Sequence, residues 1–309
     1  MAIRGVLRIG EVAVRVLDLE AAGRHYGQHI GLHETLREAG RRYYKAWDEH
    51  DHHSVVLRES DSAGLDYIAY KVLDDATLQD FERRIAASGV SVEQLPAGQF
   101  PHSGRRIQFV LPSGHRMQLY ADKARLGNGL PTHNPGVMPD EEALRGMAPT
   151  RLDHVLLAGP QLDETVRFFI EVLDFDLGEE LRDHQSGTRL AAFLCCSNKP
   201  HDIAFVLHPE AGSFHHMSFH LDSIHDVYRA GDIMGKHDIP VEVGPTRHGI
   251  TRGATIYFYD PSGNRNEVFS GGYIHYPDLP TLTWDTTRLG HAAFSIDNTP
   301  RQSFFEVVT

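Results

Sequence analysis

The chain has 309 residues, of which 41% are hydrophobic and 23% are charged, and its formal net charge is −12. This composition is that of a globular protein with enough residues for one large or two ordinary domains. The negative charge, without any basic block, argues against nucleic acid or an anionic membrane as a partner. There is no recognisable signal peptide, no apolar run long enough to span a bilayer, and no cysteine framework beyond the neighbours Cys195 and Cys196. These absences predict a cytoplasmic protein.

The first half of the chain shows two similar series of predicted elements. A helix is predicted to begin at Asp18 and to end at Gly31, where glycine can take the left-handed closing conformation. A second helix is predicted at 74–88, and residues 122–148, rich in Gly, Pro and Asn, are predicted to form a linker. The predicted strands are 8–16, 43–47, 54–57, 65–72, 106–110 and 115–120.

The second half begins the same pattern again. Helices are predicted at 163–173 and 223–234, and a turn at 260–263 joins the last two strands into a hairpin. The predicted strands are 151–157, 188–194, 202–207, 215–221, 254–259 and the run that contains Glu267. The pattern indicates an α+β fold of four strand–helix–strand–strand–strand (βαβββ) modules, paired into two similar domains, 1–148 and 149–309.

An alignment of the two halves singles out three strand positions in the second. The matched pairs are His154 with Glu11, His216 with Tyr67, and Glu267 with Gln118. Any one of these histidines, taken alone, is more typical of a hydrogen-bonded core or surface residue. Together at matched positions they indicate a metal site, because two imidazoles and one carboxylate are the ligand set of non-haem Fe(II) oxygenases.

Three stretches carry a more specific likeness: His215-His-Met-Ser-Phe-His-Leu221, Gly244-Pro-Thr-Arg-His-Gly249 and Thr255-Ile-Tyr-Phe-Tyr-Asp-Pro-Ser-Gly-Asn-Arg-Asn-Glu-Val-Phe269. With them, nearly the whole chain resembles the extradiol ring-cleaving dioxygenases of the vicinal oxygen chelate (glyoxalase-like) superfamily, specifically the catechol 2,3-dioxygenases. The resemblance implies meta cleavage of catechol or alkylcatechols by O2 to 2-hydroxymuconic semialdehyde, in aromatic degradation. It also implies a homotetramer.

The resemblance further implies Fe(II) ligands at His154, His216 and Glu267, with Mn(II) as an alternative metal. His215 competes for the second ligand position. The family ligand directly precedes the Met-Ser-Phe run, so His216 is the expected ligand. His215 is then expected to point to the other face of the strand, because side chains alternate along a strand.

Catalytic roles are implied for His201, His248 and Tyr257. Without the resemblance, the two histidines are typical of loop residues and Tyr257 of ordinary strand packing. With it, Tyr257 and His248 are expected to hydrogen-bond the substrate oxygens. His201 is expected to stabilise developing charge on oxygen and to act as general acid, a role suited to a histidine whose pKa is near neutrality.

Two other segments lead to expectations. The acidic and histidine-rich run 48–53 is expected to be a hydrophilic hairpin tip, with a second metal site there as the less favoured alternative. The tail, 283–309, is expected to cover the open mouth of the metal module or to mediate subunit contacts.

Two other functional classes are alternatives to the dioxygenase. A metal-dependent isomerase or lyase, such as a glyoxalase, would draw ligands from both paired modules and would lack the set His201, His248 and Tyr257. A drug-sequestering binding protein would need no metal ligands at all. A complete His-His-Glu set confined to one half of the chain argues against both.

Overall fold

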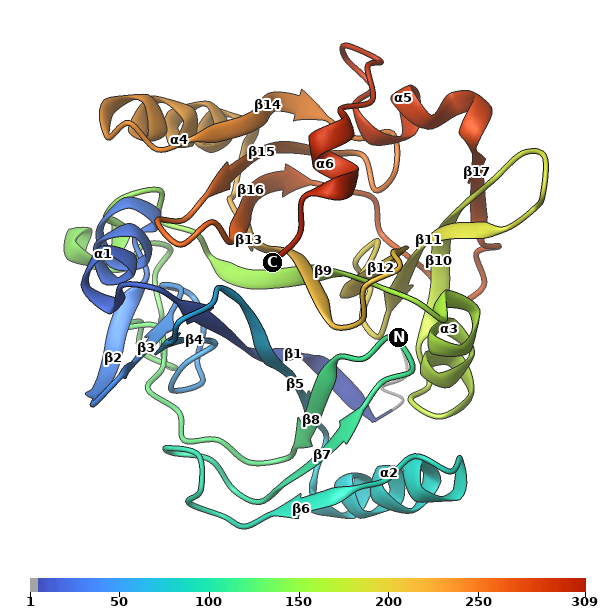
Figure 1. Cartoon of the computed structure of the whole chain (residues 1–309). Coiled ribbons are helices and arrows are strands. Elements are labelled where there is room, and N and C mark those ends of the chain that lie inside the picture. Colours follow the sequence, from blue (N-terminus) through green and yellow to red (C-terminus); the bar gives the residue numbers. More distant parts are fainter. Residues whose placement is uncertain (1–4) are drawn as a thin grey trace.

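Two mixed β-sheets, one from each half of the chain, make up the structure, a computed structural model that describes residues 5–309 (Figure 1). The first sheet has the strand order β2-β3-β4-β1-β5-β8-β7-β6. Its strands are β1 (Val6–Val16), β2 (His33–Glu38), β3 (Arg41–Lys45), β4 (Val55–Glu59), β5 (Gly64–Val72), β6 (Glu93–Leu95), β7 (Arg106–Val110) and β8 (Arg116–Tyr120). Its helices are α1 (Leu19–Arg24), the π-helix η1 (His25–Ile30) and α2 (Asp75–Ala87).

The second sheet has the order β14-β15-β16-β13-β9-β12-β11-β10-β17. Its strands are β9 (Arg151–Gly159), β10 (Asp176–Arg182), β11 (Arg189–Cys195), β12 (Ile203–Leu207), β13 (Ser213–His220), β14 (Val241–Arg247), β15 (Gly253–Tyr259), β16 (Arg265–Gly271) and β17 (Leu282–Asp285). The remaining helices are η2 (Glu141–Leu144), α3 (Leu162–Glu171), α4 (Ile224–Lys236), η3 (Thr286–Arg288), α5 (Leu289–Ala293) and α6 (Gln302–Glu306). None of the helices between residues 5 and 309 is long and apolar enough to cross a membrane.

The four predicted modules are present, and each contains one strand that the sequence pattern did not locate. These strands are β2, β6, β10 and β14. Three of them are the outermost strands of their sheets, and β10 is covered only by β17. The three outermost strands bury fewer side chains, so the alternation of apolar and polar residues along them is weak. In β10 the alternation is interrupted by the charged neighbours Glu179 and Glu180.

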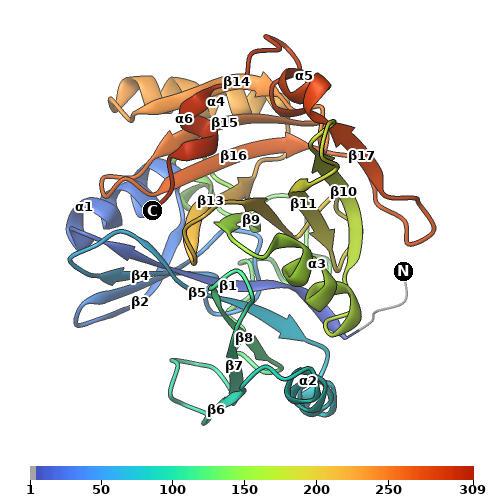
Figure 2. The same cartoon turned by 45° about the vertical axis from the view of Figure 1, so that its right-hand side comes forward.

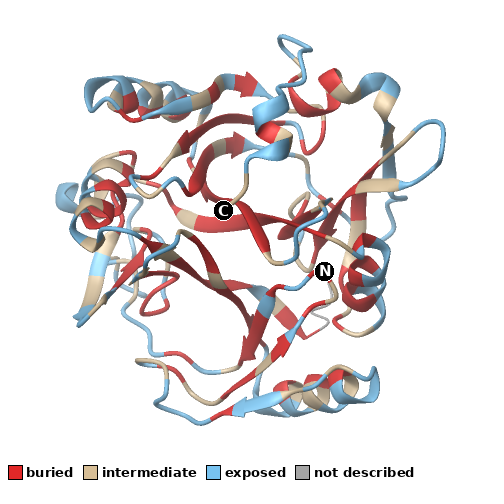
Figure 3. Ribbon diagram, viewed as in Figure 1, coloured by how far each residue is buried: buried red, intermediate tan, exposed pale blue. Residues whose placement is uncertain are grey.

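The helices pack on the sheets through one apolar face each, and their outer faces are exposed (Figure 3). Helix α2 buries Leu78, Phe81 and Ile85, which lie on one side of a helix because they are three and four residues apart. The prediction for the first helix is confirmed at both ends. Asp18 accepts hydrogen bonds from the first turn, and Gly31 has a φ of 94° in the left-handed region.

The expectation of a hydrophilic hairpin tip at 48–53 holds for Asp48 and His50, which are exposed between the antiparallel strands β3 and β4, but it is wrong for residues 51–53. Asp51, His52 and His53 are buried, and the carboxylate of Asp51 lies 2.8 Å from Nζ of Lys71. The segment packs against the second half of the chain, where Glu49 accepts a hydrogen bond from the backbone N–H of Leu152 (3.1 Å). Paired polar groups can be buried at such a contact, and the sequence alone does not show the pairing.

The first half also contacts the turn that leads into β16. The Tyr26 hydroxyl donates to Oδ2 of Asp260 (3.1 Å), and the backbone N–H of Gly64 donates to Oδ1 of Asn264 (2.8 Å). The side-chain amide of Asn264 in turn donates to the backbone carbonyl of Arg15 (2.9 Å). The start of β16 is therefore held by backbone and side chains from the other sheet.

The tail after β16 returns to the second sheet. Strand β17 pairs in parallel with β10, while α5 and α6 lie on one side of the sheet near β15 and β16 (Figures 1 and 2). Phe294 and Phe304 of the tail pack against Tyr257 and Val243 in a buried apolar cluster. The tail thus covers this part of the second half, as expected, while a role in subunit contacts stays a prediction.

Candidate metal centre and substrate cavity

Three neighbouring strands bring His154, His216 and Glu267 together. His154 on β9 and Glu267 on β16 are both paired with Ser218 of the intervening strand β13, and His216 precedes Ser218 by two residues. The three side chains therefore lie on one face of the sheet. They are buried, and one potential ligand atom from each lies within 4.8 Å of the others. No other such group of histidine, cysteine and carboxylate side chains occurs among residues 5–309.

The donor atoms fit a divalent metal ion. Nε2 of His154 and Nε2 of His216 lie 2.9 Å and 3.4 Å from the same oxygen, Oε2 of Glu267. Nε2 of His216 is buried and has no hydrogen-bond partner, which is costly unless a ligand engages it. The other oxygen of Glu267 accepts a hydrogen bond from the Thr255 hydroxyl (2.5 Å), which fixes the orientation of the carboxylate.

The electrostatics favour the charge states that bind a metal. Burial alone would raise the pKa of Glu267, but the hydrogen bond from His154 and the neighbouring imidazole of His216 hold it well below its usual value. Burial lowers the pKa of His216 to about 4. Burial would also lower the pKa of His154, yet its hydrogen bonds with Asp153 and Glu267 raise it. A carboxylate and a neutral imidazole, that of His216, are therefore in place to bind a metal ion.

Asp153 orients His154, and the sequence pattern did not identify it. Leu152 and His154 are paired with the adjacent residues Phe219 and Ser218, so β9 holds one extra residue, Asp153, at this point. This β-bulge places the carboxylate of Asp153 beside the imidazole of the next residue, His154, with Oδ2 3.0 Å from Nδ1. The Nε2 atom of His154 is then directed at the metal position.

A second bulge corrects the prediction for His215. Phe214 and His216 are paired with the adjacent residues Leu157 and Leu156, which leaves His215 as the extra residue of β13. His215 therefore does not point to the other face of the strand. Its Nδ1 lies 2.7 Å from Nδ1 of His216. Strict alternation, on which the prediction rested, fails wherever a strand contains an extra residue.

The three predicted catalytic side chains lie around the same point. The ring centroid of His201 is 4.1 Å from that of His154. Tyr257 is paired directly with Glu267 across β15 and β16, and its hydroxyl lies 2.8 Å from Nε2 of His248. Burial, and to a smaller extent the neighbouring His154, holds the pKa of His201 well below its usual value. The prediction of a pKa near neutrality for His201 is therefore wrong. Burial, then Glu267, raises the pKa of Tyr257 well above its usual value.

A cavity of about 280 Å³ opens beside these side chains. Most of its wall is apolar, and the polar side chains are gathered at the metal position. The apolar wall includes Leu156, Leu181, Leu190, Phe193, Val206, Ile250, Phe269, Leu289, Ala292 and Phe304. Leu289, Ala292 and Phe304 belong to the tail, so the tail closes one side. The volume of the cavity is at the small end of the range for ligand pockets and suits a single aromatic ring.

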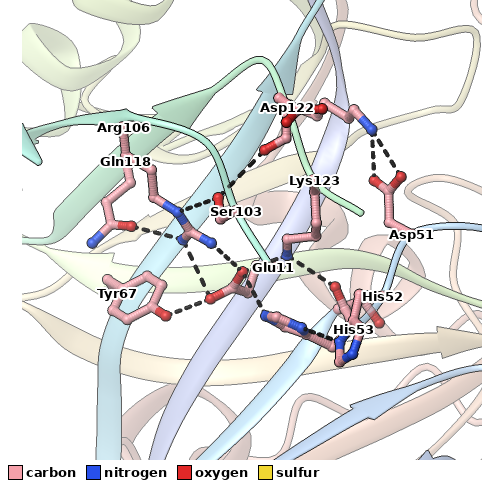
Figure 4. A network of polar contacts seen from close by, with 12 residues as sticks. Glu11, Asp51, His52, His53, Tyr67, Ser103, Arg106, Gln118, Asp122 and Lys123 are labelled. Atoms are coloured by element: carbon pink, nitrogen blue, oxygen red, sulfur yellow. Dashed lines mark hydrogen bonds and ion pairs between the residues drawn. The ribbon is translucent and has the colours of Figure 1, made fainter. Parts of the chain in front are cut away.

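The matching position in the first sheet is filled by charged side chains of the protein itself (Figure 4). Ala69 is paired with both Glu11 and Gln118, as Ser218 is with His154 and Glu267, which confirms the alignment of the halves. The carboxylate of Glu11 contacts Nη2 of Arg106 (2.8 Å) and the ammonium group of Lys123. Two cationic side chains therefore lie where the second sheet has its cluster of ligand atoms.

Two family models match the chain. The model described as "Catechol 2,3-dioxygenase-like N-terminal domain" matches residues 65–124. The model of the "Glyoxalase/Bleomycin resistance protein/Dioxygenase superfamily" matches residues 151–268, which include all three candidate ligands.

Known proteins are similar over the whole length. A metapyrocatechase of Pseudomonas sp. (strain CF600) is 47% identical over 308 residues, 99% of each chain. A manganese-dependent 2,3-dihydroxybiphenyl 1,2-dioxygenase of Geobacillus genomosp. 3 is 29% identical over 92% of this chain and 91% of its own. The crystal structure of the 2,3-dioxygenase LapB from Pseudomonas sp. KL28 superposes with a TM-score of 0.90 at 47% identity, covering 93% of this chain and 99% of that one.

Proposed function

We propose that this chain, which belongs to the metapyrocatechase family of extradiol ring-cleaving dioxygenases, performs its reaction at the centre formed by His154, His216 and Glu267. The enzyme cleaves a catechol ring beside its two hydroxyl groups and incorporates both atoms of O2. The observation that carries the site proposal is the convergence of two imidazoles and one carboxylate at the wall of an apolar cavity of ring size.

Fe(II) is the proposed metal. Two imidazoles and one carboxylate would leave positions on the ion for both substrates, which suits Fe(II) oxygenase chemistry, and the unpartnered Nε2 of His216 supports a bound ion. When bound, the metal supplies Lewis acidity and a template for both substrates. Mn(II) is the alternative, because oxygen and imidazole ligands do not separate the two ions well and one relative is manganese-dependent.

We assign His248 the role of accepting a proton from the substrate. Its Nδ1 contacts the backbone carbonyl of Ala293, which can only accept, so Nδ1 carries the hydrogen. Nε2 then carries no hydrogen and accepts a hydrogen bond from the hydroxyl of Tyr257 (2.8 Å). A catechol hydroxyl in this position can donate its proton to Nε2, while the Tyr257 hydroxyl hydrogen-bonds the same substrate oxygen.

His201 lies against the ring of His154. Its Nδ1 is buried without a hydrogen-bond partner. We assign it the stabilisation of negative charge on oxygen and general acid catalysis, the roles that the family resemblance implies.

The direct test is anaerobic loading with Fe(II), followed by catechol and air. We expect a yellow ring-cleavage product that requires Fe(II) and does not form with Zn(II), which has no redox chemistry. Colourless mixtures with catechol and methylcatechols, in protein shown to contain iron, would instead favour an isomerase or a binding protein.

Replacement of His201 by Phe should preserve iron content and reduce turnover. Phe keeps an aromatic ring against His154 but removes the proton donor, and general acid catalysis contributes about 10²- to 10⁴-fold. Iron analysis and kcat measured on the same preparation check this. Loss of iron in proportion to activity would show that His201 supports the metal site rather than the chemistry.

Three finer expectations from the sequence stay predictions: the homotetramer, the cytoplasmic location, and the functional division of the chain at 148/149. The preferred substituted catechol depends on the apolar wall, and the tail contributes Leu289, Ala292 and Phe304 to it.

A further inference from the structure

We propose that His215 is a positioning residue, which fixes the orientation and tautomer of the metal ligand His216 and connects that ligand to helix α6 of the tail. The inference rests on the metal site proposed above. It starts from a chain of three buried groups: Nδ1 of His216 lies 2.7 Å from Nδ1 of His215, and Nε2 of His215 lies 2.6 Å from the backbone carbonyl oxygen of Phe304.

The carbonyl determines where each proton lies. A carbonyl oxygen can only accept, so Nε2 of His215 must carry a hydrogen. The two Nδ1 atoms, 2.7 Å apart, can share a hydrogen bond only if one of them accepts. A His216 that binds a metal ion through Nε2 carries its hydrogen on Nδ1, so the acceptor is Nδ1 of His215. His216 must then donate from its own Nδ1. Its Nε2 is left without hydrogen and is directed at Glu267, 3.4 Å away.

The accepting carbonyl is itself held in place. Arg265 donates from Nη1 to the carbonyls of His215 (3.3 Å) and Val307 (2.9 Å), and from Nη2 to that of Ser303 (3.3 Å). Helix α6 is therefore fastened to the bulge of β13 through one buried guanidinium. A shift of α6 would move the hydrogen-bond acceptor on which the His216 tautomer depends.

The first sheet shows that the bulge alone does not create this arrangement. Leu65 and Tyr67 are paired with the adjacent residues Val14 and Ala13, so Asp66 is the extra residue at the position of His215. The carboxylate of Asp66 is taken up by Arg58, at 2.7 Å from Nη2. The same β-bulge thus holds a histidine that can accept a hydrogen bond where the next residue is a proposed metal ligand, and a partly buried ion pair where it is not.

Two substitutions separate the two hydrogen bonds of His215. In His215→Asn, Oδ1 takes the place of Nδ1 and can still accept from His216, whereas the bond to the Phe304 carbonyl is lost. In His215→Gln, the amide nitrogen takes the place of Nε2 and can still donate to Phe304, whereas the acceptor for His216 is lost. His115→Asn and His115→Gln are matched controls, because His115 is buried and its Nε2 also contacts a backbone carbonyl, that of Ser213 (2.8 Å).

We expect His215→Gln to weaken Fe(II) binding about 10- to 100-fold, the usual effect of losing a partner that orients a metal ligand. His215→Asn should stay close to the wild type, and both His115 variants should be unchanged. The measurement is anaerobic competition for Fe(II) with a chromogenic chelator, which does not depend on turnover. Neutron diffraction of the metal-free protein should place a deuteron on Nδ1 of His216 and none on Nε2.

Equal Fe(II) affinity of the Asn and Gln variants, or a deuteron on Nε2 of His216, would overturn the role of His215. Glu267→Ala in the same titration distinguishes this failure from that of the proposed function. If Glu267→Ala loses Fe(II) while both His215 variants keep it, only the positioning role is wrong. If Glu267→Ala also binds Fe(II) like the wild type, the metal site itself is wrong.

Discussion

Replacement of Glu267 by alanine should abolish ring cleavage and remove bound iron together. Glu267 is the only anionic member of the proposed ligand set, and its carboxylate lies within 3.4 Å of both ligand imidazoles. Without it, two neutral imidazoles remain, and the net positive charge of the ion is no longer reduced in a buried site. We expect no measurable yellow product and no iron retained after gel filtration.

Two further variants serve as controls for Glu267→Ala. Thr255→Val removes the hydroxyl that orients the carboxylate but keeps the ligand, so iron affinity should fall by only about 10- to 100-fold. Gln118→Ala makes the same kind of truncation at the matching position of the first sheet and should leave iron content unchanged. An active, iron-loaded Glu267→Ala protein would refute the ligand assignment.

Replacement of Glu11 by Gln should have the largest effect on stability, although this residue lies outside the metal site. The carboxylate contacts the buried cations Arg106 and Lys123 and accepts a hydrogen bond from Tyr67 (Figure 4). Gln keeps the volume but leaves two positive charges without a counterion. Removal of one partner from a buried ion pair costs about 3–5 kcal/mol, and denaturant unfolding followed by circular dichroism measures it.

The effect should depend on pH in a definite direction. Burial alone would raise the pKa of Glu11, but Arg106, Lys123 and His53 hold it well below its usual value. A carboxyl group whose pKa is lowered by folding stabilises the folded state above its unfolded pKa, about 4.5. That contribution is lost as the pH falls further. The difference between wild type and Glu11→Gln should therefore be full at pH 7 and should shrink below about pH 4.5.

A matched substitution isolates the charge. Tyr67→Phe removes one hydrogen bond to the same carboxylate and should cost about 0.5–1.5 kcal/mol without the acid-dependent change. A loss below about 1 kcal/mol for Glu11→Gln, the size of a surface ion pair, would show that the network is not a major source of stability.

Much of the site was predictable because its chemistry is local. The candidate ligands lie at strand positions that the internal repeat aligns, and the structure brings His154, His216 and Glu267 within one cluster. The hairpin that carries Tyr257 opposite Glu267 follows from two aromatic runs around a Pro-Gly turn. Its backbone turn closes as expected, with the Gly263 N–H donating to the carbonyl of Asp260 (3.0 Å).

The features that escaped prediction depend on contacts between distant segments. Whether a strand contains an extra residue is decided by its partner strand, so the orientations of Asp153 and His215 could not be derived from alternation. The burial of Asp51 likewise depends on Lys71, a residue of another strand. The outermost strands β2, β6 and β14 were not predicted, because a partly exposed strand needs few apolar residues in its sequence.

The contacts that Tyr26, Gly64 and Arg15 make with the turn before β16 have a consequence for how the molecule can be divided. A fragment that began at residue 149 would contain every candidate ligand, but Asp260 and Asn264 would lose these buried partners just upstream of Glu267. Unpaired polar groups draw in water and loosen the backbone that carries them. The first half of the chain therefore helps to hold the turn before Glu267 in place. A truncated protein that contains only the second half would lack contacts that support one of the proposed metal ligands.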